Sequence, residues 1–126
     1  LKAIERHFFY LQSKLKILLV GNNGIDRIDG FSFSNMGNLI ELNLVNEKLS
    51  FIDKNVFKGL EKNPLKLNLN SNYIEKIFKD TFIYLENLRE LYLDFNQINF
   101  IDPTAFSFMN SLEYLSIIKN KIKTLE

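Results

Sequence analysis

The chain contains no cysteine, and this absence excludes two common kinds of site. Without a thiol there is neither a disulfide framework nor a thiolate metal site, and the redox compartment stays open. Long hydrophobic runs are also absent, because no apolar stretch approaches the length that crosses a bilayer. We therefore expect no membrane insertion in this segment.

An excess of charge of one sign is missing too. The chain has 16 Lys and Arg residues, 15 Asp and Glu residues and a formal net charge of +1, with no cluster of basic residues. Phosphate binding relies on clustered Lys and Arg side chains that nearby acids do not neutralise. We therefore predict that nucleic acid is not the partner.

Residues suited to catalysis are few. His7 is the only histidine, and neither a cysteine nor a recognisable nucleophile motif accompanies it. Glu90 and Asp94 could in principle act as an acid–base pair or bind a cation, but a solvated acidic patch is the favoured interpretation. The stretch Gly21 to Gly24 loosely resembles a phosphate-binding loop, yet no Lys-Ser or Lys-Thr follows it. We predict that the chain is not an enzyme and has no catalytic residue, cofactor or metal.

The sequence does have an asparagine that recurs at a fixed interval. Asn72, Asn96 and Asn120 follow one another at steps of 24 residues, and Asn23 is a fourth copy. Each asparagine lies in the same frame of apolar residues, at constant offsets on both sides. Around Asn96 the frame consists of Leu91, Leu93, Ile98, Ile101, Phe106, Met109 and Leu112. One register that returns along the whole chain predicts a repeat architecture.

One copy departs from the pattern. Between Asn23 and Asn72 the key position is Glu47, whose carboxylate offers acceptors but no amide donor, and we expect a local irregularity there. The next unit is one residue longer and has Pro64 where its first leucine belongs, which removes a backbone donor at the start of a strand. If the coils are numbered from that of Asn23, Glu47 lies in the second and Asn72 in the third. These departures predict that the junction between the second and third coils has the lowest local stability of the internal junctions.

The unit reads L-x-x-L-x-L-x-x-N-x-I-x-x-I-x-x-x-x-F-x-x-L, and it resembles the leucine-rich repeat in its 24-residue typical form. This resemblance implies an α/β fold: a curved solenoid with a parallel sheet on the concave face and loops, turns and short helical pieces on the convex face. The phenylalanine of each unit would form an aromatic stack that holds neighbouring coils in register. These positions are Phe9, Phe33, Phe57, Phe82 and Phe106.

In leucine-rich repeats the recurring asparagine belongs to a row known as the asparagine ladder. After each strand the backbone turns sharply inside the solenoid, where unpaired peptide groups cost free energy. An asparagine amide offers donors and an acceptor, so it suits both the turn and the adjacent coil. The resemblance assigns this structural role to Asn23, Asn72, Asn96 and Asn120.

The repeats extend from end to end, so we expect a single domain, residues 1–126, of about five repeats. A composition of 46% hydrophobic and 25% charged residues is that of a folded soluble domain. The chain starts and ends within a unit and begins with neither a methionine nor a signal-like segment. We expect a fragment that lacks N- and C-terminal caps and whose open ends could self-associate.

Side chains between the leucines of each strand should face the concave side. On the third and fourth coils they are tyrosine, asparagine and charged residues, a mixture that suits protein recognition. The alternative is that they are the polar residues of any solvent-facing sheet, with tyrosine a good strand former. We predict that the partner-binding residues are Lys66, Asn68, Asn70, Glu90, Tyr92, Asp94 and Tyr114, with Tyr92 and Tyr114 as anchors.

The 24-residue form with its phenylalanine column looks like the repeats of Toll-like receptors, Slit-type guidance proteins and small extracellular proteoglycans. That resemblance implies a protein ligand on the concave face of an extracellular or cell-surface receptor, or of a secreted recognition protein, with roles in signalling and innate immunity. The flanking cysteine clusters of those families are absent. One alternative is a cytoplasmic scaffold or regulatory subunit, in which lack of cysteine is unremarkable. Another is a substrate-docking arm whose catalytic domain is encoded elsewhere.

Overall fold

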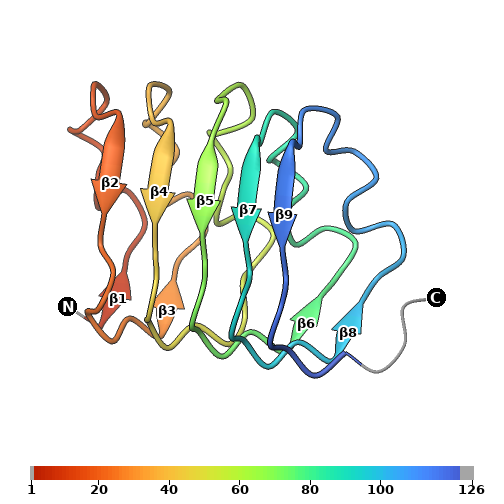
Figure 1. Cartoon of the computed structure of the whole chain (residues 1–126). Helices are drawn as coiled ribbons and strands as arrows, with labels where there is room; N and C mark the ends of the chain where they lie inside the picture. The colour runs from red at the N-terminus through yellow and green to blue at the C-terminus, as the bar shows by residue number, and fades with distance from the viewer. Residues whose placement is uncertain (1, 123–126) are drawn as a thin grey trace.

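The computed structural model describes residues 2–122, which wind as a solenoid whose coils lie side by side (Figure 1). Each coil contributes one short strand to a 5-stranded parallel sheet. In spatial order the strands are β2 (Ile17–Leu19), β4 (Glu41–Asn43), β5 (Lys66–Asn68), β7 (Glu90–Tyr92) and β9 (Tyr114–Ser116). The solenoid with a parallel sheet on its concave face, expected from the repeat, is confirmed.

The opposite side of the coils carries shorter strands. Here β1 (Ala3–Ile4) pairs with β3 (Arg27–Ile28), and β6 (Lys76–Ile77) pairs with β8 (Phe100–Ile101), both in parallel. Between β3 and β6 the second coil contributes no strand, so this outer row is interrupted at the coil that contains Glu47.

The convex segments are the loops and turns that the resemblance implies, without its short helical pieces. Within residues 2–122 no segment is helical. Leu85 N–H donates to the carbonyl of Phe82 and Leu88 N–H donates to that of Leu85, at 2.9 and 3.1 Å. These bonds span three residues and are not consecutive, whereas an α-helix needs a consecutive series that spans four and a 3-10 helix a consecutive series that spans three. These turns return the chain to the next strand of the sheet.

The leucines of each strand form the inner layer of the core. Leu42, Leu67 and Leu91 are 0% exposed and are aligned directly across β4, β5 and β7. Their neighbours along each strand are partly exposed, as the period of two requires. The side chains that alternate with the leucines therefore line the concave face.

The phenylalanines form a second, aromatic layer of the core. Ring centroids of successive members are 6.0 Å apart for Phe9 and Phe33, 6.4 Å for Phe33 and Phe57, 6.1 Å for Phe57 and Phe82, and 6.4 Å for Phe82 and Phe106. The middle three rings are at most 1% exposed. Each ring thus packs against the corresponding ring of the next coil and joins the two.

The extra residue of the third coil is accommodated at Pro64. Pro64 is exposed, while Asn63 before it and Leu65 after it are 3% and 0% exposed. The Asn63 side-chain amide donates to the carbonyls of Met36 and Leu39 in the preceding coil, at 3.0 and 2.8 Å. The proline therefore bulges outward, and a buried asparagine that the repeat pattern does not indicate ties the third coil to the second.

Candidate functional site

The recurring asparagine joins each coil to the one before it. Asn96 Nδ2 donates to the carbonyls of Leu93 and Asp94 in its own coil, at 3.1 and 3.3 Å, and to that of Leu69 in the preceding coil, at 3.0 Å. Its Oδ1 accepts from Ile74 N–H at 3.1 Å. Asn96 is 3% exposed. The same arrangement recurs at Asn72 and Asn120.

The first two coils differ from this arrangement. Asn23 is exposed, and its Nδ2 donates to the carbonyls of Val20 and Gly21 at 2.6 and 3.2 Å. Glu47 is 3% exposed, and its carboxylate accepts from the N–H groups of Asn23, at 3.0 and 3.1 Å, and of Ile25, at 2.8 Å. Glu47 thus accepts from the backbone N–H groups of the preceding coil, as an asparagine at this position would, but it donates no hydrogen bond to a carbonyl.

Four of the residues predicted to bind a partner lie together on the concave face. Tyr92 donates its hydroxyl to Glu90 Oε1 at 2.6 Å. The ring centroids of Tyr92 and Tyr114 are 5.2 Å apart, and Lys66 Nζ lies 5.6 Å from the centroid of the Tyr92 ring. Tyr114 remains 50% exposed. These four residues, from β5, β7 and β9, are called the tyrosine cluster below.

The other three predicted residues make hydrogen bonds that stabilise strand ends. Asn68 Oδ1 accepts from Asn70 N–H at 2.9 Å, and Asn70 Oδ1 accepts from Asp94 N–H at 2.7 Å. Asp94 Oδ1 accepts from the Ser116 hydroxyl and from Ile118 N–H, at 2.6 and 2.9 Å. The structure therefore gives each of them a role in the fold, beside the tyrosine cluster.

The carboxylates of the face are engaged separately rather than as a pair. Glu90 accepts from Tyr92 and Asp94 from Ser116. Across residues 2–122 no group of three or more His, Cys, Asp and Glu side chains is arranged to hold a metal ion. This arrangement fits the interpretation of a solvated acidic patch better than that of an acid–base pair.

One more asparagine belongs to this face. Asn43 on β4 is directly paired with Asn68 on β5, and its Oδ1 accepts from Val45 N–H at 2.9 Å. Asn43 was not among the residues predicted to bind a partner. The signal for it is its repeat position, which is the same as that of Asn68 and Tyr92.

The pKa of Tyr92 is raised from its ordinary 10.0 to about 12. The largest cause is the hydrogen bond to Glu90, and partial burial and nearby negative charge add to it. Because the pKa of Tyr92 is higher in the folded than in the unfolded state, the neutral hydroxyl stabilises the fold. This contribution is fully present below pH 10 and is lost as the pH rises through about 12. We expect an ultraviolet difference titration of the wild type against Tyr92→Phe to show this late ionisation. Glu90→Gln should move it toward 10.0. Ionisation at the ordinary value in the wild type would contradict the bond.

Open hollows occur along the described part of the chain, and two of them adjoin the start of sheet strands. One, of about 380 Å³, lies at the start of β4, β5 and β7, where Pro64 bulges out. It borders the tyrosine cluster, since Lys66 and Glu90 belong to both. Its other lining residues are Ile40, Glu41, Pro64 and Arg89.

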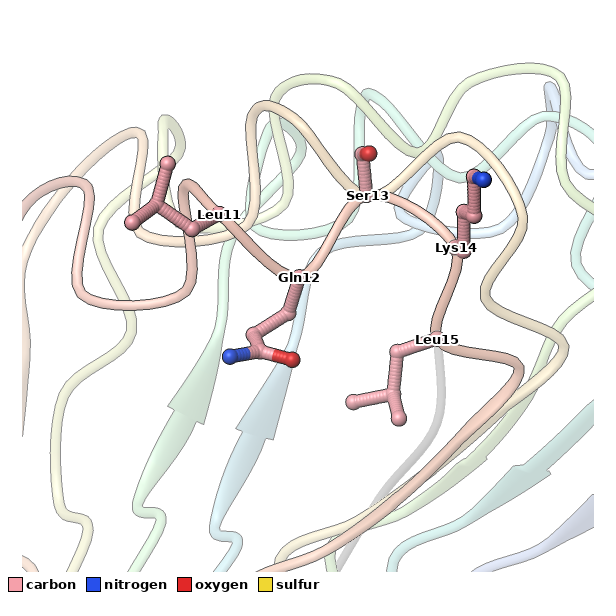
Figure 2. A pocket seen from close by; sticks show the side chains of 5 residues that line it. All are labelled: Leu11, Gln12, Ser13, Lys14 and Leu15. Carbon is pink, nitrogen blue, oxygen red and sulfur yellow. The ribbon is translucent and has the colours of Figure 1, made fainter.

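The second hollow, of about 370 Å³, is lined by one loop, residues 11–15, which precedes β2. In Figure 2 the side chains of Ser13 and Lys14 point away from those of Gln12 and Leu15. This loop brings together no residues from different coils, so the concave face is the better candidate. In residues 2–122 there is no helix of the length and apolar character that a membrane crossing requires.

Comparison with known proteins gives consistent matches. The family model described as "Leucine rich repeat" matches residues 13–62 and 65–126. Podocan-like protein 1 of Homo sapiens is 36% identical over 86 residues, which are 67% of this chain and 16% of that protein. The chain therefore spans a small part of that relative's length.

Solved structures match the fold of the whole chain. The structure of a TLR13–ssRNA13 complex matches with a TM-score of 0.86 and 27% identity, over 96% of this chain and 17% of that one. The structure of the Toll–Spatzle complex, described as a molecular hub in Drosophila development and innate immunity, matches with a TM-score of 0.73 and 22% identity. The second match covers 99% of this chain and 20% of that one, and it supports the fold alone.

Proposed function

Because the chain belongs to the leucine-rich repeat family, we propose that it is a protein-recognition module that binds its partner through the concave face. The observation that carries the proposal is the tyrosine cluster. Tyr92 and Tyr114 pack together on adjacent strands of the sheet, Glu90 accepts the hydrogen bond of the Tyr92 hydroxyl, and Lys66 Nζ lies over the Tyr92 ring. Two partly exposed tyrosines held in place offer contact area at little cost in conformational entropy.

The charge of the concave face favours a protein over a nucleic acid. Among the side chains that alternate with the strand leucines in residues 2–122, Lys66 is the one cation, against Glu41, Glu90 and Asp94. A phosphate backbone would meet more negative than positive charge there. TLR13 was solved with a single-stranded RNA and Toll with Spatzle. Of these two kinds of partner, the face of this chain suits a protein.

The proposed setting is an extracellular or cell-surface receptor, or a secreted recognition protein, that acts in signalling such as innate immunity. The resemblance of the repeats to Toll-like receptors and the match to TLR13 support this setting. We further propose that the chain is not itself an enzyme. A cytoplasmic scaffold or regulatory subunit is the alternative, and a signal peptide in the full-length gene product would separate the two. That peptide is expected for the first and not for the second.

The test is to screen an array of purified secreted and cell-surface proteins with the chain and three variants. We expect a protein that binds the wild type and Lys79→Ala but loses binding to Tyr92→Ala and Tyr114→Ala. Lys79 is exposed and lies two residues after β6, away from the concave face. Circular dichroism of each variant checks the fold. Equal loss in all three variants, no loss in any of them, or no bound protein would remove the concave face from consideration.

A further inference from the structure

We infer that the concave face recognises the backbone carbonyl groups of an extended peptide segment without acidic side chains, through the side-chain amides of Asn43, Asn68 and Asn70. The inference rests on the proposed function and names the chemistry of its partner. It concerns three residues of β4 and β5 and of the turn that follows β5. Each of them is half-buried.

The orientation of these three amides is fixed by the fold. Their Oδ1 atoms accept from the N–H groups of Val45, Asn70 and Asp94, at 2.9, 2.9 and 2.7 Å. A backbone N–H is satisfied only by an acceptor, so Oδ1 and not Nδ2 must occupy that place. Within residues 2–122 none of the three Nδ2 groups has a hydrogen-bond partner. Their donors are therefore left for a partner or for water.

The donors lie in a row that leads to the tyrosine cluster. Asn43 on β4 is paired directly with Asn68 on β5, and Asn68 is paired with Tyr92 on β7. Adjacent strands are about 4.8 Å apart, so an extended segment laid across them reaches each in turn. Asn70 follows Asn68 on the same face, two residues further along. A peptide whose carbonyls meet the amides would thus place a side chain against Tyr92 and Tyr114.

The charges around the row select among hydrogen-bond acceptors. Glu41 lies on β4 with Asn43, Glu90 and Asp94 lie on and just after β7, and Lys66 is the one cation among the described side chains that alternate with the leucines. A carboxylate or a phosphate would be repelled by three acids, whereas a neutral backbone carbonyl would not be. Because each amide is already held at Oδ1, binding would restrict little additional side-chain freedom. The face therefore matches neutral acceptors.

The experiment uses Asn→Asp substitutions, which retain the acceptor and remove the donor. We expect the fold to tolerate this exchange, since Asp94 Oδ1 accepts from Ile118 N–H at 2.9 Å just as Asn70 Oδ1 accepts from Asp94 N–H. Asp102 Oδ1 likewise accepts from Thr104 N–H, two residues on, at 2.8 Å. The variants are Asn43→Asp and Asn68→Asp. Asn99→Asp is the control, an exposed residue whose Oδ1 accepts from Lys76 Nζ at 3.3 Å.

Random linear peptides displayed on phage are selected on the immobilised wild-type chain, and the enriched sequences are synthesised with neutral ends as probes. We expect peptides without acidic residues whose Kd rises about fivefold in each of the two concave variants, the equivalent of one hydrogen bond. The control should bind as the wild type does. The loss should persist at high salt, because an effect of the added charge alone would be screened.

The other outcomes separate the inference from the proposed function. Peptides that lose binding to Tyr92→Ala, but not to Asn43→Asp or Asn68→Asp, would overturn the role of the amides and leave the concave docking face standing. Peptides that bind all of these variants equally would overturn both. Enrichment of no peptide would overturn the inference. Oligouridine is tested as a separate probe and is expected not to bind. Binding that is lost in Tyr92→Ala would reassign the partner to nucleic acid and overturn both.

Discussion

Replacing Phe57 with alanine is expected to lower the free energy of unfolding by about 3–5 kcal/mol. The ring is 1% exposed and lies between those of Phe33, 6.4 Å away, and Phe82, 6.1 Å away. In a repeat protein each coil is stabilised mainly by its neighbours. Truncation in the middle of the stack therefore weakens two junctions at once. Urea denaturation followed by circular dichroism measures the change.

The matched control lies in the same coil. Phe51 is 64% exposed, and Phe51→Ala should change the stability by less than about 0.5 kcal/mol. Phe106→Ala should fall between the two, because Phe106 is only half-buried and within residues 2–122 its ring stacks on that of Phe82 alone. Equal losses for Phe51 and Phe57 would show that the aromatic stack does not hold the coils together.

The fold followed from the sequence where every coil obeys the same constraint. A strand leucine and a buried phenylalanine recur because each coil packs against a copy of itself, so the repeat spacing placed Leu67 and Leu91, and the resemblance to the leucine-rich repeat implied the aromatic stack. The adjustments of single coils did not follow. Asn63 is buried because Pro64 bulges outward beside it, and that geometry depends on how one extra residue is accommodated. A repeat pattern predicts the features that all coils share, and it does not predict how a single coil adapts to an extra residue.

The same distinction applies to the concave face. Strands aligned in register place Lys66, Tyr92 and Tyr114 on neighbouring strands, so their proximity could be read from the repeat spacing. The hydrogen bond from Tyr92 to Glu90 depends on side-chain rotamers. The hydrogen bond from Asn70 N–H to Asn68 Oδ1 depends on the conformation of the local turn. The repeat spacing therefore located the candidate face, and only the three-dimensional structure divides its polar groups into those already paired and those available to a partner.

The ladder asparagines should not contribute equally, and the difference comes from Glu47. The carbonyl of Leu69 accepts from both Asn72 and Asn96, at 3.1 and 3.0 Å, so it keeps one donor when either is removed. The carbonyl of Leu44 accepts from Asn72 at 3.0 Å, and Glu47 of its own coil has no amide to donate. Asn72→Ala therefore leaves Leu44 C=O without its side-chain donor, in addition to depriving a backbone N–H of its acceptor.

We accordingly expect Asn72→Ala to lower the free energy of unfolding by about 3 kcal/mol and Asn96→Ala by about 2 kcal/mol, since each unpaired buried group costs about 1–3 kcal/mol. Urea denaturation of both variants is repeated in a Glu47→Asn background, in which a new amide at position 47 supplies the missing donor to Leu44. The two alanine variants should then lose similar amounts. A difference that persists in that background would mean that Glu47 is not its cause.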